Sequence, residues 1–280
     1  MFRKITSDNK VFMNEEFQKD KYEFNIIMKN LSSDDLELYS DEENYIICRG
    51  SKNLPTWIWT RDNISEKLVV EIEELIKLYL TDKEKDAFTC KREFYNMLIQ
   101  SGFKNINKED YFEMGFLRCD KLIGTRKHLG RLSKPTEKDR AILEKFWYDD
   151  SIESNGIANR TIEQAKKDVD AFLKRWDFFV LRNDEGKVVS MASFSVLGDQ
   201  GKFGNVYTPP EERRKGYASY LVYILTMNLL CNDLVPIVYT EYNYGPSNKM
   251  YKSIGYEDKG VLVNFSCSKV KEKAKQYTMC

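Results

Sequence analysis

Apolar residues recur along the chain with two different periods, and each period predicts a different kind of element. After Ser65, a residue type that often caps helices, apolar side chains return every three or four positions up to Leu80. A second run of this kind follows Thr161, where Thr161 and Gln164 form a capping box. Both runs predict amphipathic helices. The second helix is expected to bury one face made of Ile162, Ala165, Val169, Phe172, Leu173 and Trp176.

Short apolar runs bounded by turn-forming residues predict strands. In the first half these runs are Tyr45–Cys48, Thr56–Trp59 and Ala87–Cys90, and the last leads into a helix over Arg92–Gln100. In the second half they are Phe178–Leu181, Val188–Val196 and Phe203–Tyr207. Turns at Asn183–Gly186 and Gly198–Gly201 separate the second set, so we expect three sequential antiparallel strands there.

The remaining pattern of the second half alternates helices with strands. Thr136 is placed to cap a helix through Tyr148. The later elements are an apolar helix over Gly216–Cys231, a strand over Ile237–Tyr242, a helix over Ser247–Ile254 and strands through Ser268. The apolar helix is too short and interrupted to cross a bilayer, and no other stretch reaches the roughly 18 apolar residues that a membrane span needs.

The stretch between the two sets of elements predicts a domain boundary. Residues 120–135 contain Gly124, Gly130 and many basic residues with little periodicity, which is typical of a linker. We therefore expect two domains, 1–128 and 129–280, each of mixed α/β type.

The two halves also repeat an order of features. Thr60 ends a strand before a helix, as Thr208 does, and Gly102 follows a short helix, as Gly255 does. Thr60 and Gly102 are about 42 residues apart, and Thr208 and Gly255 are about 47 apart. A degenerate duplication would explain this order. The alternative is that any two mixed α/β segments share such features by chance.

Charge and composition narrow the class of function. The 44 Lys and Arg residues balance 44 Asp and Glu residues, so no global field attracts polyanions, and a dedicated nucleic-acid-binding protein is disfavoured. The first ten residues carry several charges before any apolar run. We expect neither a targeting segment nor a membrane anchor, and thus a soluble, cytoplasmic protein.

Cysteine and histidine offer little chemistry. The six cysteines are widely spaced without a Cys-x-x-Cys pair, which favours reduced thiols with packing roles: Cys48, Cys90, Cys119, Cys231, Cys267 and Cys280. The single histidine, His128, excludes a multi-histidine metal site, and we expect it on the surface. No metal is expected.

The segment from Val206 to Ala218 carries the clearest chemical signal. A strand ends there, the chain turns, and a buried helix begins at Gly216. The unpaired first-turn amides and the helix dipole favour an anion, while Arg213, Arg214 and Lys215 add positive charge. A pyrophosphate would suit this cradle, although the spacing matches neither nucleotide-binding glycine motif. The alternative is a solvated basic turn.

At these residues the chain resembles the GNAT superfamily of acyl-CoA-dependent N-acetyltransferases. The family's Arg/Gln-x-x-Gly-x-Gly/Ala motif is met by Arg213, Gly216 and Ala218. Its second signature, an Asn and a Tyr on a helix that ends in Gly and an aromatic residue, resembles Asn248 to Tyr256. The resemblance covers about Leu129 to Ser268. It implies a mostly antiparallel GNAT-type sheet flanked by helices, in a tandem form whose first half lacks the glycine loop.

The resemblance also implies a site. Acetyl-CoA would be the co-substrate, and its pantetheine arm would pair with the edge Gly204–Tyr207, where a backbone amide of Val206 or Tyr207 stabilises the oxyanion. Tyr251 would be the general acid, whereas Leu98 stands at its place in the first half. The full set of implied cofactor contacts is Val206, Thr208, Arg213, Arg214, Lys215, Gly216, Tyr217, Ala218, Ser219, Ser247, Asn248 and Tyr251, with Ser247 as a helix cap.

Several points stay open at the level of sequence. Glu241 is the first choice for the base that deprotonates the acceptor amine and Glu153 the second, although a water chain can also serve. Many family members carry Asn-Pro where Tyr244 and Gly245 stand, so the acceptor, whether a small amine or a peptide, is not identified. Oligomeric state is also open. The alternative function is an acyl-CoA-binding or sensing protein without catalysis.

Overall fold

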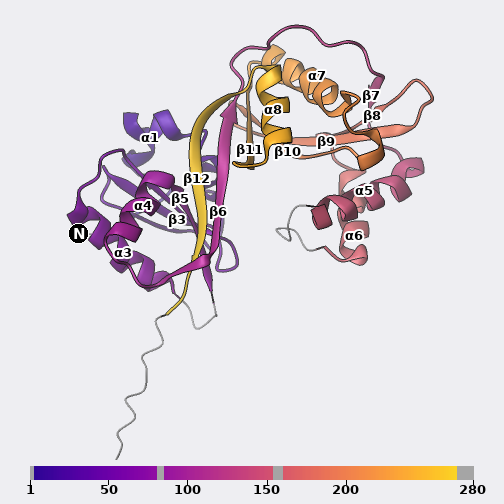
Figure 1. The fold of residues 1–280 in the computed structure, drawn as a ribbon. Helices are drawn as coiled ribbons and strands as arrows, with labels where there is room; N and C mark the ends of the chain where they lie inside the picture. Colours follow the sequence, from indigo (N-terminus) through magenta and orange to yellow (C-terminus); the bar gives the residue numbers. More distant parts are fainter. Residues whose placement is uncertain (1–2, 81–84, 154–159, 270–280) are drawn as a thin grey trace, which may run out of the picture. The chain divides into compact units, whose positions relative to one another are not determined.

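The computed structural model describes residues 3–80, 85–153 and 160–269, which divide into two compact units (Figure 1). The first unit contains the described residues up to Phe116, Glu241–Asn243, and the described residues from Lys259 onward. The second contains Leu117–Thr240 and Tyr244–Asp258. This division differs from the expected boundary at 128/129, because the last strand of the chain returns to the first unit.

The first unit is built on a mixed sheet. Its helical elements are η1 (Lys10–Met13), α1 (Glu15–Asp20), α2 (Asn25–Asn30), α3 (Glu66–Tyr79) and α4 (Arg92–Gln100). Its strands are β1 (Arg3–Lys4), β2 (Glu37–Ser40), β3 (Tyr45–Arg49), β4 (Thr56–Thr60), β5 (Asp86–Lys91) and most of β6 (Ile106–Arg118) and β12 (Glu257–Cys267). They lie in the order β1-β2-β3-β4-β5-β12-β6.

Alternation along β4 places helices on both faces of this sheet. Ile58 joins a core with apolar residues of α3 and α4, whereas Trp57 and Trp59 point the other way. Trp59 meets the ring of Phe17 from α1 edge-on at 5.2 Å, and Trp57 meets Phe24 at 6.2 Å.

The second unit repeats this layered plan. Its helical elements are η2 (Glu137–Asp139), α5 (Arg140–Glu153), α6 (Ile162–Phe172), η3 (Pro210–Glu212), α7 (Tyr217–Cys231) and α8 (Gly245–Ile254). Its strands are β7 (Arg131–Ser133), β8 (Phe178–Arg182), β9 (Val188–Leu197), β10 (Gln200–Tyr207) and β11 (Val235–Glu241), in the order β11-β10-β9-β8-β7. Helices α5 and α6 share one core with the sheet, and α7 and α8 share another on its opposite face (Figure 1).

Each unit contains one parallel strand pair joined by a helix. In the first, Thr56, Trp57 and Ile58 of β4 pair with Phe88, Thr89 and Cys90 of β5. In the second, Gln200, Gly201 and Lys202 of β10 pair with Val235, Pro236 and Ile237 of β11. Both pairings therefore run for three positions and connect through α3 or α7.

The helices that follow these pairs end alike. Phe103 donates its backbone N–H to the carbonyl of Leu98 over 3.3 Å, and Tyr256 donates to Tyr251 over 3.2 Å, across glycines with φ of 82° and 125°. Leu98 and Tyr251 thus hold the same place in the two caps. The repeated order expected from sequence has this counterpart in the structure.

Most predicted elements are confirmed, including the mixed, mostly antiparallel sheet with flanking helices. The structure adds the N-terminal elements, β6 and β7, which the sequence analysis did not predict. Two predicted core residues are wrong: Ile162 is 53% exposed and Trp176 is 64% exposed. Ser247 is not a helix cap, because α8 begins at Gly245 after its cap Tyr244, with Pro246 in its first turn.

The remaining expectations concern cysteine, histidine and membrane spans. The five cysteines within the described ranges are free thiols, four of them buried and Cys231 exposed, while Cys280 lies outside those ranges. His128 lies exposed in an irregular segment. In the described part of the chain, no helix combines the length and apolar character that a bilayer crossing requires.

Candidate functional site

Part of the edge of β10 that faces β11 is unpaired. Pairing between β10 and β11 ends at Lys202 and Ile237, although β10 continues to Tyr207 and β11 to Glu241. Beyond Lys202 the edge of β10 therefore has no ladder partner on the β11 side. Such an edge can pair with an extended ligand, as the resemblance implies for the pantetheine arm.

A β-bulge lies in this unpaired stretch. Phe203 pairs with Phe194 and Val206 with Ala192, so β10 spends one more residue than β9 between the two pairs. The bulge directs side chains of β10 to both faces of the sheet. Phe203 and Val206 face the core shared with α7 and α8, while Asn205 and Tyr207 contact α5.

Gly216 opens the helix that follows. It is the N-cap residue of α7 with a φ of 88°, and no side chain caps the helix. A Cβ at this position would lie 3.0 Å from Cδ1 of Leu129, so a side chain there would be strained and crowded. No side chain therefore satisfies the first amides of α7, and anion binding there stays a prediction.

The three cationic side chains of the loop differ in the contacts that restrain them. Arg213 donates to the carbonyl of Thr208 over 2.8 Å and forms an ion pair with Glu153. Lys215 contacts Glu212 at 2.8 Å. Among the described residues, neither an ion pair nor a hydrogen bond engages the side chain of Arg214, whose φ of 61° is itself rare for a side-chain-bearing residue. A contact between Arg214 and a phosphate stays a prediction.

Tyr251 lies on the α8 side of the sheet. Its side chain is 3% exposed and shares the core that contains Phe203, with its ring 5.1 Å from that of Tyr256. Burial raises the pKa of the Tyr251 hydroxyl, so the group stays protonated at neutral pH. A protonated phenol is the state that a general acid requires.

A polar cluster lies on the opposite, α5 side. Asp150 accepts a hydrogen bond from the amide of Asn205 over 2.9 Å, and Glu153 accepts one from the hydroxyl of Tyr207 over 3.0 Å. Burial raises the pKa of Asp150. Burial, followed by the bond to Glu153, also raises the pKa of Tyr207. Sequence reasoning missed Asp150, since no local motif marks it.

The other predicted contact residues surround the loop. Thr208 is buried, and its hydroxyl lies 2.9 Å from that of Ser190. Ser219 accepts a hydrogen bond from Arg126 over 3.3 Å. Tyr217, Ala218, Ser247 and Asn248 are half-buried in the first turns of α7 and α8. Their cofactor contacts stay predictions.

Glu241, the first-choice base, is the last residue of β11 and falls in the first unit. Its role as the base stays a prediction. Glu153, the second choice, has both carboxylate oxygens engaged, by Tyr207 and by Arg213.

In the first unit, the helix start equivalent to that of α7 is capped by a side chain. Ser65 caps α3 by accepting from the amide of Leu68, so its helix start is satisfied internally. At the end of β5, Lys91 contacts Asp20 at 2.5 Å and Asp62 at 2.8 Å. An anion approaching this helix start would meet the carboxylate of Asp62, which disfavours phosphate binding.

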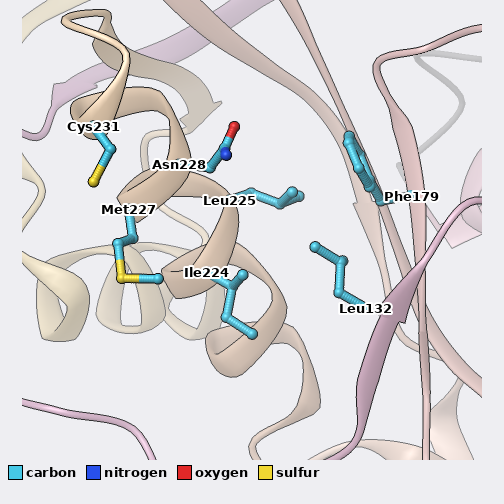
Figure 2. Close-up of a pocket in the computed structure, with 7 residues that line it drawn as sticks. All are labelled: Leu132, Phe179, Ile224, Leu225, Met227, Asn228 and Cys231. Carbon is cyan, nitrogen blue, oxygen red and sulfur yellow. The ribbon is translucent and has the colours of Figure 1, made fainter.

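A separate pocket in the second unit lies between α7 and the strands β7 and β8 (Figure 2). Leu132 and Phe179 face the helix residues across it, and the pocket lining contains no charged side chain. It offers no charged group for phosphate binding. Within the residues that the structure places, no cluster of histidine, cysteine or carboxylate side chains fits a metal ion.

Comparison with known proteins shows which folds this architecture resembles. Residues 182–263 match the family model described as "FR47-like protein". A search of curated proteins finds no match to the chain. The similar solved structures include an acetyltransferase of the GNAT family from Colwellia psychrerythraea, with 11% identity, a TM-score of 0.60 and coverage of 96% of this chain and 100% of that one.

Two further structures agree. A GCN5-related N-acetyltransferase from Sphaerobacter thermophilus has 12% identity and a TM-score of 0.60, covering 95% of this chain and 94% of that one. One from Kribbella flavida has 11% identity and a TM-score of 0.58, covering 91% and 96%. The chain therefore has the fold of the GNAT superfamily over nearly its whole length, which confirms the resemblance drawn from the two motifs.

Proposed function

We propose that this protein is an acyl-CoA-dependent N-acyltransferase that moves an acetyl group from acetyl-CoA to a primary amine. The observation that carries the proposal is the separation of β10 from β11 after three paired positions, beside a helix start that no side chain caps. The open edge suits an extended pantetheine arm, and the helix start suits its pyrophosphate.

The residues of the second unit fit the parts of such a reaction. Backbone amides of Val206 or Tyr207 would stabilise the oxyanion of the thioester carbonyl. Tyr251 would donate a proton to the leaving thiolate. Direct attack by the amine needs no acyl-enzyme, so a Cys/His pair is not required.

The first test is calorimetric binding of acetyl-CoA to the whole protein and to a Gly216→Glu variant. We expect saturable binding that the variant loses, because the added carboxylate would fill and repel the cradle. Gly186→Glu is the matched control: Gly186 also has a positive φ, 81°, but a Cβ there meets nothing within 4 Å. Equal binding by both variants would contradict the proposed cradle.

The second test measures release of the CoA thiol with a panel of primary amines. Amine-dependent release supports the transferase. Tight binding of acetyl-CoA without turnover on any amine would instead favour a non-catalytic acyl-CoA sensor.

A further inference from the structure

An amine in its ammonium form has no lone pair for attack, so the proposed reaction needs a proton acceptor on the acceptor side. The sequence offers two candidates for this role, Glu241 and Glu153. Glu241 ends β11, and both carboxylate oxygens of Glu153 already accept hydrogen bonds, from Tyr207 and Arg213.

Asp150 lies one helical turn before Glu153 on α5. Its carboxylate accepts a hydrogen bond from the uncharged side-chain amide of Asn205 over 2.9 Å. Asn205 belongs to the bulge of β10, where the extra residue aims this side chain at α5. The bulge thus ties Asp150 to the residue directly before the backbone amide of Val206.

Tyr251 and Asp150 approach this part of β10 from opposite faces. Val206 and Phe203 pack in the core that contains Tyr251, while Asn205 and Tyr207 face α5. A thioester carbonyl held at the open edge would then have a proton donor on one face and a carboxylate on the other. This arrangement separates the leaving thiolate from the incoming amine.

From this geometry, and resting on the proposed function, we infer that Asp150 is the catalytic proton acceptor for the amine substrate, and that Asn205 positions its carboxylate. Glu153 and Arg213 then act as positioning residues that hold Tyr207 and the phosphate loop against α5.

The Asp150 carboxylate takes one proton from R–NH₃⁺, and the freed lone pair forms the new C–N bond with the thioester carbon. The C–S bond breaks with its electron pair on sulfur, which takes the proton of Tyr251. Asp150 returns its proton to water and then takes the second proton from nitrogen, which it also passes to water, while water reprotonates the Tyr251 phenolate. The products are the amide, CoA thiol and one released proton.

The surroundings of Asp150 favour this role at neutral pH. The charged and titratable groups around it are Glu153 on its own helix, Arg160 before α6, Tyr207 on β10 and Arg213 of the loop. Burial raises the pKa of Asp150 despite the opposing hydrogen bond from Asn205 and the two guanidinium groups. A carboxylate with a raised pKa is a stronger base than one in water.

The test compares Asp150→Asn with Asp149→Asn, whose native carboxylate is paired with Lys145 on the same helix. Both are measured with an amine that the wild-type protein acetylates. We expect Asp150→Asn to lower kcat/KM by about 100-fold or more at pH 7 and to keep acetyl-CoA affinity. The deficit should shrink as the pH approaches the pKa of the amine, because free amine then needs no base. Asp150→Glu should restore part of the rate.

Three results would overturn the inference. The first is equal activity of the two asparagine variants. The second is a deficit in Asp150→Asn that is the same at every pH, which indicates positioning alone. The third is wild-type inactivity with every amine, which removes the proposed function itself and is distinguished from the others because it needs no variant.

Discussion

Tyr251 and Leu98 occupy the same position relative to the ends of their helices, but only Tyr251 carries a group that can donate a proton. Each accepts a backbone hydrogen bond from the aromatic residue five positions later, and each is buried. At this position the two units therefore differ by one phenol in the same local geometry. That place makes the function of the hydroxyl testable with little disturbance of the fold.

We expect Tyr251→Phe to lower kcat by about 100-fold or more while leaving the affinity for acetyl-CoA unchanged. The ring and its contact with Tyr256 remain, and none of the described residues hydrogen-bonds to the Tyr251 hydroxyl. Steady-state kinetics and calorimetry measure the two quantities. Because burial raises the pKa of this hydroxyl, the wild-type rate should show no loss from its ionisation below pH 10.

Tyr256→Phe is the matched control. Its hydroxyl lies 2.9 Å from that of Thr226 inside the same core, so its removal should cost about 1 kcal/mol of stability and leave kcat intact. A loss of kcat in Tyr256→Phe equal to that in Tyr251→Phe would contradict a specific proton donor.

At the scale of elements, the turn between α1 and α2 packs against β12 through a buried carboxyl group. Glu23 is 6% exposed, and Gly260 of β12 leaves the space that it occupies. Burial, with a further contribution from Asp20, raises the pKa of Glu23 to about 8. The folded protein therefore keeps a proton that the unfolded chain loses above its ordinary carboxyl pKa.

This proton makes stability fall as the pH rises. Between about pH 4.5 and pH 8 the folded state binds one more proton at Glu23 than the unfolded state, so the unfolding free energy should decrease by about 1.4 kcal/mol per pH unit from this group. Glu23→Gln should flatten this slope, as read from urea midpoints at pH 5 and pH 8. Glu15→Gln, at an exposed site of α1, should leave it unchanged.

The elements that the sequence predicts well are those bounded by turn-forming residues. Helix α4 has the predicted bounds, and the turn Asn183–Gly186 separates β8 from β9 as expected. Strand β6 was missed because its first half is mostly polar and only partly buried, so no alternation marks it. Trp176 broke the helical pattern because α6 ends before it, at Phe172.

The parts of the candidate site also differ in how far the sequence alone predicts them. The loop at Gly216 and the helix that carries Tyr251 are local motifs, so the sequence alone locates them. The contact between Asn205 and Asp150 joins residues 55 positions apart and depends on a one-residue bulge in strand pairing. No pattern within a single element encodes that register.

For the whole molecule, the comparison of the two units predicts one acetyl-CoA per chain. The helix start of α3 is capped by Ser65, and Lys91 is held by Asp20 and Asp62 at the end of β5, whereas Gly216 leaves α7 uncapped. Calorimetry of the intact protein should therefore give a stoichiometry near one. Two equivalents would mean that the first unit also binds the co-substrate.

Because β12 returns to the first unit, β5 is synthesised well before the strand that pairs with it. Leu262–Cys267 pair with Lys91–Asp86, and Val263 and Phe265 complete the core around α3 and α4. At about 5–20 residues per second, roughly ten to thirty seconds of translation separate the two strands. During this interval the edge of β5 that β12 covers in the native sheet has no partner, so the first unit completes its core only after β12 has been synthesised.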